Sequence, residues 1–133
     1  MTHQFMGPLL AAAFTAIALF PSVAAADDRA MCFKGSGDAA IAACTRRIAA
    51  NSSISDQTTR HNLAVVYYSR GFLLLEKKET QRALTDFDRS WRTDPSYARA
   101  LYGRGLAKKR LGDITGGDAD IARAKELQPS LPN

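Results

Sequence analysis

The chain has 133 residues, room for one domain, and 18 Lys and Arg against 13 Asp and Glu give it a formal net charge of +5. Two histidines and two cysteines are present, and neither His-Glu-x-x-His nor Gly-x-Ser-x-Gly occurs, which excludes the usual zinc proteases and Ser–His–Asp hydrolases. Gly103-Arg104-Gly105 lacks the third glycine of a dinucleotide loop, and Asp118 stands where a phosphate loop needs lysine. We therefore expect no catalysis, no cofactor and no metal.

Residues 1–26 have the pattern of a secretory signal peptide. An apolar run from Met6 to Phe20 is followed by Pro21 and by the small residues Ala24–Ala26. The run is shorter than the roughly 20 residues of a membrane span. Because Met1–Phe5 carries no Lys or Arg, an uncleaved anchor remains the alternative. The pattern predicts a periplasmic or secreted protein, cleaved after Ala26 or nearby.

All charged side chains follow the predicted signal peptide, so the exported part carries the whole net charge. A basic exported protein seldom meets nucleic acid, and its charge favours solubility or attracts anionic surfaces. We expect no nucleic-acid partner. Peripheral contact with anionic lipid or cell wall remains an alternative.

Cys32 and Cys44 are predicted to form a structural disulfide, because an even pair of cysteines in an oxidising compartment is typically bonded. Closing a loop of about 13 residues stabilises by roughly 3 kcal/mol in the chain-entropy model. We expect Asp27–Gly37 to be an irregular leader held by this bond, with Asp38 capping the next helix.

Five helices are predicted and no strand, which makes the protein all-α. Apolar residues recur at three- and four-residue spacing within the expected helices. The breaks between helices include Asn51-Ser52-Ser53, Asp94-Pro95-Ser96 and Leu111-Gly112-Asp113. Ser55 is a plausible cap for the second helix. The expected helices cover 39–50, 56–77, 80–93, 97–110 and 114–127.

One 34-residue pattern occurs twice, at Ala64–Tyr97 and Ala98–Leu131. Eight positions are identical between the two copies, and a fixed period of this length indicates a stacked repeat array. The identical pairs are Ala64/Ala98, Tyr68/Tyr102, Arg70/Arg104, Gly71/Gly105, Asp86/Asp120, Arg89/Arg123, Pro95/Pro129 and Ser96/Ser130. Arg70 and Asp86 are 16 residues apart, as are Arg104 and Asp120, so we expect an ion pair across each hairpin.

The pattern resembles the tetratricopeptide repeat (TPR), a helix–turn–helix unit with small residues where its helices cross, an aromatic between units and a closing proline. The residues that carry this resemblance are Gly71, Ala83, Phe87 and Pro95, then Gly105, Gly117, Ile121 and Pro129. Lys78, Ser90 and Gly117 depart from the usual TPR residues. The whole chain is similar to small secreted TPR proteins of Gram-negative bacteria.

The resemblance implies a short right-handed α-solenoid of about two and a half units. TPR units at 64–97 and 98–131 would follow a segment at 27–63 that holds the disulfide-tethered leader, a degenerate half-repeat and the lead-in of the next helix. In the half-repeat, Cys44 takes the place of Phe87. Nothing after Pro129 supplies a closing helix, so self-association through the last helix is an open alternative.

The resemblance also implies a concave groove lined by the first helix of each unit. The expected binding residues are Tyr68, Phe72, Arg99, Tyr102, Leu106, Lys109 and Arg110, with Val65, Leu75 and Glu76 completing the wall. The alternative is that the tyrosines merely cover the edge of the core. Ser69 and Gly103 stand where some TPR domains carry the asparagines of a carboxylate clamp, so binding of chaperone tails is not expected.

The function predicted from these observations is an exported protein-interaction module that binds a peptide or partner helix in its groove. The alternative is a basic envelope-surface protein that contacts anionic lipid or cell wall.

Overall fold

The structure is a computed structural model that describes residues 22–51, 53 and 56–132. This part of the chain contains six helices and no strand, so the predicted all-α class is confirmed. The helices are α1 (Ser22–Lys34), α2 (Gly37–Ala50), α3 (Gln57–Glu76), α4 (Thr80–Thr93), α5 (Ala98–Arg110) and α6 (Ile114–Leu127). Among the described helices, none combines the length and apolarity needed to cross a membrane.

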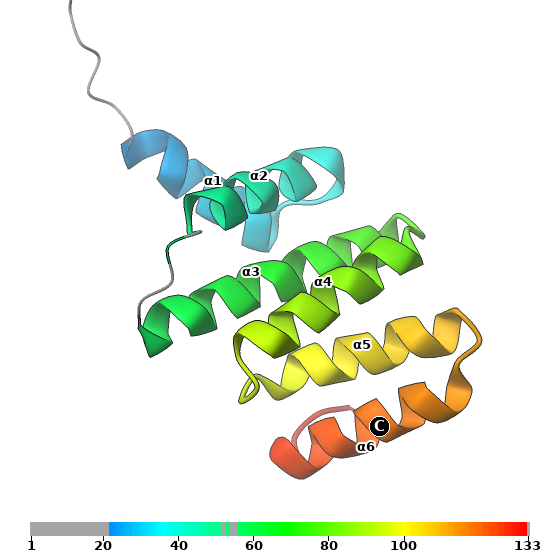
Figure 1. Cartoon of the computed structure of the whole chain (residues 1–133). Coiled ribbons are helices and arrows are strands. Elements are labelled where there is room, and N and C mark those ends of the chain that lie inside the picture. The colour runs from blue at the N-terminus through cyan, green and yellow to red at the C-terminus, as the bar shows by residue number, and fades with distance from the viewer. Residues whose placement is uncertain (1–21, 52, 54–55, 133) are drawn as a thin grey trace, which may run out of the picture.

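The helices pack as three successive hairpins, α1 with α2, α3 with α4 and α5 with α6, which follow one another from one end of the molecule to the other (Figure 1). Short turns close the second and third hairpins. Lys78 has a positive φ of 63° in the turn after α3, and Gly112 has φ 95° in the turn after α5. Glycine adopts this left-handed backbone without strain, whereas Lys78 does so at a cost.

The expectation of an irregular leader at Asp27–Gly37 is wrong, because α1 continues to Lys34 and packs against α2. Ala26, Ala30 and Met31 are good helix formers, and α1 buries the Cys32 side chain to 3% exposure. The described residues therefore contain one helix more than predicted. The predicted signal peptide lies outside the described residues, apart from residues 22–26, which begin α1.

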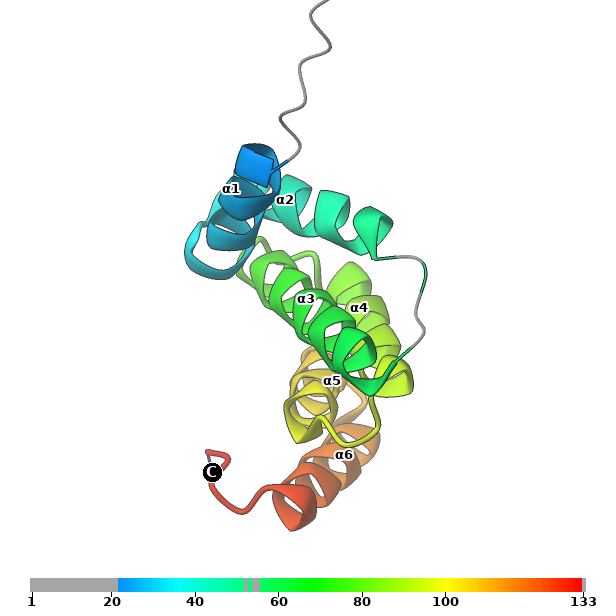
Figure 2. The same ribbon diagram turned by 90° about the vertical axis from the view of Figure 1, so that its left-hand side faces the viewer.

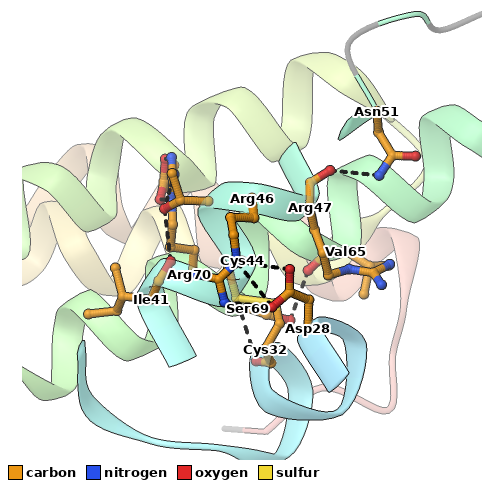
Figure 3. The surroundings of a disulfide bond; sticks show 12 residues. Asp28, Cys32, Ile41, Cys44, Arg46, Arg47, Asn51, Val65, Ser69 and Arg70 are labelled. Carbon is orange, nitrogen blue, oxygen red and sulfur yellow. Dashed lines mark hydrogen bonds and ion pairs between the residues drawn. A yellow bond between two sulfur atoms is a disulfide. The ribbon is translucent and has the colours of Figure 1, made fainter. Parts of the chain in front are cut away.

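A disulfide joins Cys32 on α1 to Cys44 on α2, as predicted (Figure 3). Both cysteines are buried and belong to a core cluster of the first hairpin and α3, made up of Cys32, Ala40, Ala43, Cys44, Val66 and Leu73. The cross-link therefore lies inside the packing of the first hairpin.

Two helix starts differ from the predicted caps. The N-cap of α2 is Ser36, and Asp38 lies in the first turn, where it pairs with Lys77 at the end of α3. The N-cap of α3 is Asp56, whose side chain accepts a hydrogen bond from the Thr59 amide at 2.9 Å. A carboxylate here satisfies an amide that the helix leaves unpaired.

The hairpins are stacked unevenly. The first helices contact one another in sequence, α1 against α3 and α3 against α5. Within the described residues the backbones of α2, α4 and α6 do not come close to one another, and α4 lies against α3 and α5. Figure 2 shows α1, α3 and α5 following one another down the molecule. Between hairpins the most extensive packing is that of α2 on α3 and of α4 on α5, and the first helices also touch one another along one side. We call this side, formed by α1, α3 and α5, the inner side of the stack.

Phe87 is the main packing element between the second and third hairpins, and it is fully buried. A Cβ at Gly71 on α3 would lie 2.8 Å from the Phe87 ring, and a Cβ at Gly103 on α5 would lie 2.6 Å from it. The ring is held between two glycines, one in its own hairpin and one in the next. Gly71 and Phe87 were predicted packing positions, whereas Gly103 was not.

The third hairpin closes by direct backbone approach. A Cβ at Gly105 on α5 would lie 2.6 Å from the Gly117 carbonyl oxygen on α6 and 2.7 Å from Ile121. The contacts of Gly105 and Gly117 fit their predicted place at the helix crossing, whereas the Ile121 contact lies within its own hairpin, so its role between units stays a prediction. Ala83 is likewise fully buried beside Phe87. Pro95 and Pro129 both follow the last turn of a helix, α4 and α6 respectively.

Candidate binding surface on α3 and α5

A run of aromatic rings crosses the first helices of the second and third hairpins. The Tyr68 ring lies 5.0 Å from Phe72, 5.8 Å from Phe87 and 5.4 Å from Tyr97, measured between centroids. The Tyr68–Tyr97 contact is edge-to-face, an arrangement that aromatic pairs favour. Tyr68, Phe72 and Tyr97 are partly exposed, whereas Phe87 is buried beneath them. We call Tyr68, Phe72, Tyr97 and Tyr102 the aromatic face.

Tyr68, Arg99 and Tyr102 lie close enough to influence one another electrostatically. Burial raises the pKa of the Tyr68 phenol, the Arg99 guanidinium opposes that rise, and Tyr102 adds to it. Burial, with Tyr68 beside it, raises the pKa of Tyr97 to about 12, although Arg99 hydrogen-bonds it. Tyr68 and Tyr97 are therefore neutral at physiological pH, and the structure brings three of the predicted binding residues together.

One predicted wall residue lies elsewhere than expected. Leu75 is buried to 4% exposure in a core cluster with Leu74, Ala83, Phe87 and Ala107, so its assignment to the groove wall is wrong. The physical reason is that α5 packs over this turn of α3 and covers the side chain. Phe72 and Leu106 remain half-buried, and Glu76 is exposed.

The two predicted basic residues at the end of α5 are engaged within the protein. Lys109 Nζ pairs with Asp118 Oδ1 on α6 at 2.6 Å, and the Lys109 stem lies against Gly117. Arg110 Nη1 approaches the Leu75 carbonyl oxygen at 3.5 Å. Lys109 is therefore directed toward α6 and does not join the cluster around Arg99.

His61 and Asp94 extend the aromatic face toward the turn between α4 and α5. His61 Nδ1 lies 2.6 Å from Asp94 Oδ2, and its ring meets Tyr97 edge-to-face at 5.4 Å. Asp94 is buried to 1% exposure and also accepts hydrogen bonds from the Ser96 hydroxyl and amide, at 2.6 and 3.0 Å. Burial alone would raise the pKa of Asp94, but the hydrogen bonds from Ser96 and His61 outweigh it and hold that pKa below its usual value.

Sequence reasoning missed both Tyr97 and His61 as members of this surface. Tyr97 is the N-cap of α5, and its repeat partner at position 131 is a leucine, so no periodicity identifies it. His61 lies one turn before Val65 on α3, and its spacing from Tyr68 would place it on the same side of the helix. That spacing was the available signal.

Both predicted ion pairs across the hairpins are confirmed. Arg70 donates to both oxygens of Asp86 at 2.7 and 2.8 Å, and Arg104 donates to both oxygens of Asp120 at 2.8 Å. Burial opposes ionisation of Asp120, but Arg104 and Lys108 lower its pKa below the usual value.

Each of these arginines also reaches back to the preceding hairpin. Arg70 donates to the Thr45 hydroxyl on α2 at 3.0 Å, and Arg104 donates to Asp88 on α4 at 2.9 Å. Thr45 follows Cys44 as Asp88 follows Phe87. The same contact therefore recurs at both junctions between hairpins.

In the described part of the chain, no three His, Cys, Asp or Glu side chains gather as metal ligands. No protein-family model matches the chain, and no curated protein matches it.

Proposed function

We propose that the protein is an exported interaction module of the TPR type, which holds an extended peptide or a partner helix against the inner side formed by α1, α3 and α5. The observation that carries the proposal is the uneven stacking: the first helices contact one another, whereas the described second helices do not. A continuous inner side is the surface that short helical repeats use for ligands.

The recurrent contacts support the TPR-type assignment. Arg70–Asp86 and Arg104–Asp120 repeat one bidentate pair in successive hairpins. Small residues lie at both helix crossings, with Gly71 against Phe87 and Gly105 against Gly117. The Cys32–Cys44 disulfide supports export, because disulfides persist in oxidising compartments.

The aromatic face has the chemistry of a binding surface. Tyr68 and Tyr102 are partly exposed, and Tyr68 is fixed by three ring contacts. Rigid aromatics with an arginine nearby lose little conformational entropy on binding and are enriched at interface hot spots. Arg99, which is exposed, supplies the charge. Tyr68, Tyr102 and Arg99 are the residues to which we assign most of the binding energy.

Salt dependence distinguishes this function from contact with an anionic envelope surface. At least nine of the 18 Lys and Arg side chains form ion pairs with Asp or Glu in the described part of the chain, and this pairing leaves the net charge of +5 unchanged. An envelope-binding protein would instead lose its affinity between about 50 and 300 mM salt, since exposed charge interactions are screened over that range.

Site-specific photo-crosslinking in cells tests the proposal. A photoreactive phenylalanine analogue replaces Tyr102 in one variant and the exposed Gln81 on α4 in the control. We expect protein adducts from position 102 and few from position 81. Equal yields, or adducts from position 81 alone, would move the interface away from α3 and α5.

Self-association through the C-terminal hairpin stays a prediction. α6 contacts α5 alone among the described helices, and its Ile114 and Leu127 side chains are 52% and 42% exposed. Such apolar groups at an open end of a stack favour association with a second copy. Light scattering on the wild type and on Ile114→Lys distinguishes a dimer from a monomer.

A further inference from the structure

A small cavity lies between the first hairpin and α3. Its volume is about 150 Å³, and its lining comes from all three helices: Arg29 and Phe33 on α1, Arg47 on α2, and Asn62 and Val65 on α3. Figure 3 shows the Arg47 side chain beside Val65. A cavity of this size holds a small chemical group and excludes a bulky one.

Arg47 has an unused hydrogen-bond donor at this cavity. Its guanidinium carbon lies 5.2 Å from the centroid of the Phe33 ring, and its Nε is buried without a hydrogen-bond partner among the described residues. Burial is the main influence that lowers the pKa of Arg47, the like charge of Arg29 lowers it further, and the negative charge of Asp28 opposes both. A buried charged group with an unpaired donor is costly, and Arg47 lines the cavity, so an anion held there against its guanidinium would offset part of that cost.

The Asp28 carboxylate does not serve as the hydrogen-bond acceptor for Arg47 Nε. Asp28 is bonded to Arg46, with contacts of 2.5, 2.9 and 3.1 Å (Figure 3). The hydrogen bond from Arg46 is the main influence that lowers the pKa of Asp28. Arg29, Arg47 and Asn62 all line the cavity, so its lining carries two basic residues and one amide.

The shape of the cavity favours a carboxylate among the anions. The planar guanidinium fork matches the two oxygens of a carboxylate, and Phe33 and Val65 offer apolar contact to the carbon that bears it. Val65 also belongs to the predicted groove wall, so a chain on the inner side can place a carboxylate here.

We infer that this cavity binds a carboxylate group of the peptide ligand, either its chain terminus or an acidic side chain. The inference rests on the proposed function, because it assigns one ligand group to a subsite at the α1 end of the inner side. Ser69 and Gly103 take no part in it; the donors are Arg47, Arg29 and Asn62.

Side-chain NMR tests the inference on ¹⁵N-labelled protein purified after expression with its own leader. The Arg47 Nε–Hε and Asn62 side-chain amide signals report directly on the cavity. The probes are N-acetylglycine, which carries a terminal carboxylate, N-acetylaspartate diamide, which carries a side-chain carboxylate, and neutral N-acetylglycinamide. We expect saturable shifts of both signals with at least one carboxylate and none with the neutral amide.

Charge variants assign the binding to these donors. Arg29→Gln and Arg47→Gln should each weaken the carboxylate-induced Asn62 shift by about tenfold or more. Arg123→Gln, which removes an equal charge from the exposed Arg123–Glu126 pair on α6, should leave it unchanged. Circular dichroism checks that each variant is folded. Equal weakening by all three substitutions would overturn the inference, since it would indicate general charge attraction.

Further outcomes separate the two proposals. Equal shifts with inorganic phosphate or with phosphatidylglycerol vesicles would overturn the carboxylate assignment, as would no shift with either carboxylate. One outcome would overturn the cavity inference and leave the proposed function standing. In it, crosslinking at position 102 persists in the Arg29→Gln/Arg47→Gln double variant, and neither carboxylate shifts the NMR signals. If the carboxylates bind and no adduct forms at position 102, the proposed inner-side function fails and the cavity remains an isolated anion site.

Discussion

The Arg70 guanidinium on α3 donates hydrogen bonds to both oxygens of the Asp86 carboxylate on α4, at 2.7 and 2.8 Å. Only 15% of the Arg70 side chain and 4% of the Asp86 side chain are exposed. The hydrogen bond to Asp86 is the main influence that raises the pKa of Arg70. Because the same pair recurs as Arg104–Asp120, the second and third hairpins are each held in register by one charged contact that is mostly withdrawn from water.

Removing one partner of this pair should destabilise the protein strongly. We expect Arg70→Gln to lower the free energy of unfolding by about 2–4 kcal/mol, because it leaves the Asp86 carboxylate buried without its counter-charge. Arg82→Gln, in the exposed Arg82–Glu79 pair, should cost less than about 1 kcal/mol. Urea unfolding measures both. Equal losses would contradict the importance assigned to burial.

Gly103→Ala sets two effects against each other. Alanine favours a helix over glycine by about 1 kcal/mol, but its Cβ would lie 2.6 Å from the Phe87 ring. That ring cannot retreat, because Gly71 contacts it from the other hairpin. Overpacking costs typically 1–3 kcal/mol, so we expect net destabilisation by urea unfolding.

The companion variant Phe87→Leu separates steric conflict from other causes of that loss. In the Phe87→Leu background, Gly103→Ala should cost less than it does alone, because the smaller side chain leaves room for the added methyl group. A stabilising effect of Gly103→Ala in the wild type would show that the two hairpins are not held this closely.

The disulfide should stabilise the first hairpin. We expect reduction of the Cys32–Cys44 bond to lower the free energy of unfolding by roughly 3 kcal/mol in the chain-entropy model. Thermal unfolding with and without reductant measures the change. The Cys32→Ser/Cys44→Ser double variant should be insensitive to reductant. A reductant effect that persists in this variant would have another origin.

Stability should fall in acid partly through Asp94 and Asp120. The pKa of each carboxyl is lower in the folded protein than its ordinary value near 3.8, so each contributes stability above that value. The contribution is lost as the pH falls from about 4 through the lower folded pKa values. Neither group therefore changes stability between pH 5 and pH 7.

Asp94→Asn and a matched control test this assignment. Asp94→Asn should be less stable than the wild type near pH 6 and should show a shallower decline of the urea midpoint below about pH 4. Asp27→Asn, an exposed residue of α1, should leave the acid decline unchanged. An unaltered decline in Asp94→Asn would contradict the role of the His61 and Ser96 hydrogen bonds.

The features predicted correctly from the sequence depend on contacts within one repeat. The 16-residue spacing of Arg70 and Asp86 fits one hairpin, and Phe87 recurs in register with Ile121, so one copy of the pattern supports the other. The Cys32–Cys44 pairing needed only the count of cysteines and the predicted compartment. The first two predictions were possible because the pattern repeats, and the third because two cysteines allow only one pairing.

The features that were missed depend on how neighbouring hairpins meet. Gly103 matters because Phe87 of the preceding hairpin reaches it, and Leu75 is buried because α5 covers it. Neither contact follows from the period of a single helix. The α1 helix was missed for a different reason: it shows no apolar periodicity, and its start overlaps the residues assigned to the signal peptide.

The one-sided stacking of the first helices gives the molecule a stiffness that depends on direction. Bending that narrows the inner side compresses α1, α3 and α5, which are already in contact, and close-packed side chains resist compression. Bending that widens it is opposed by the packing of α2 on α3 and of α4 on α5, together with the Arg70–Thr45 and Arg104–Asp88 hydrogen bonds. A thicker ligand is therefore accommodated at the cost of packing and polar contacts between hairpins, whereas closing around a thinner one would compress the first helices.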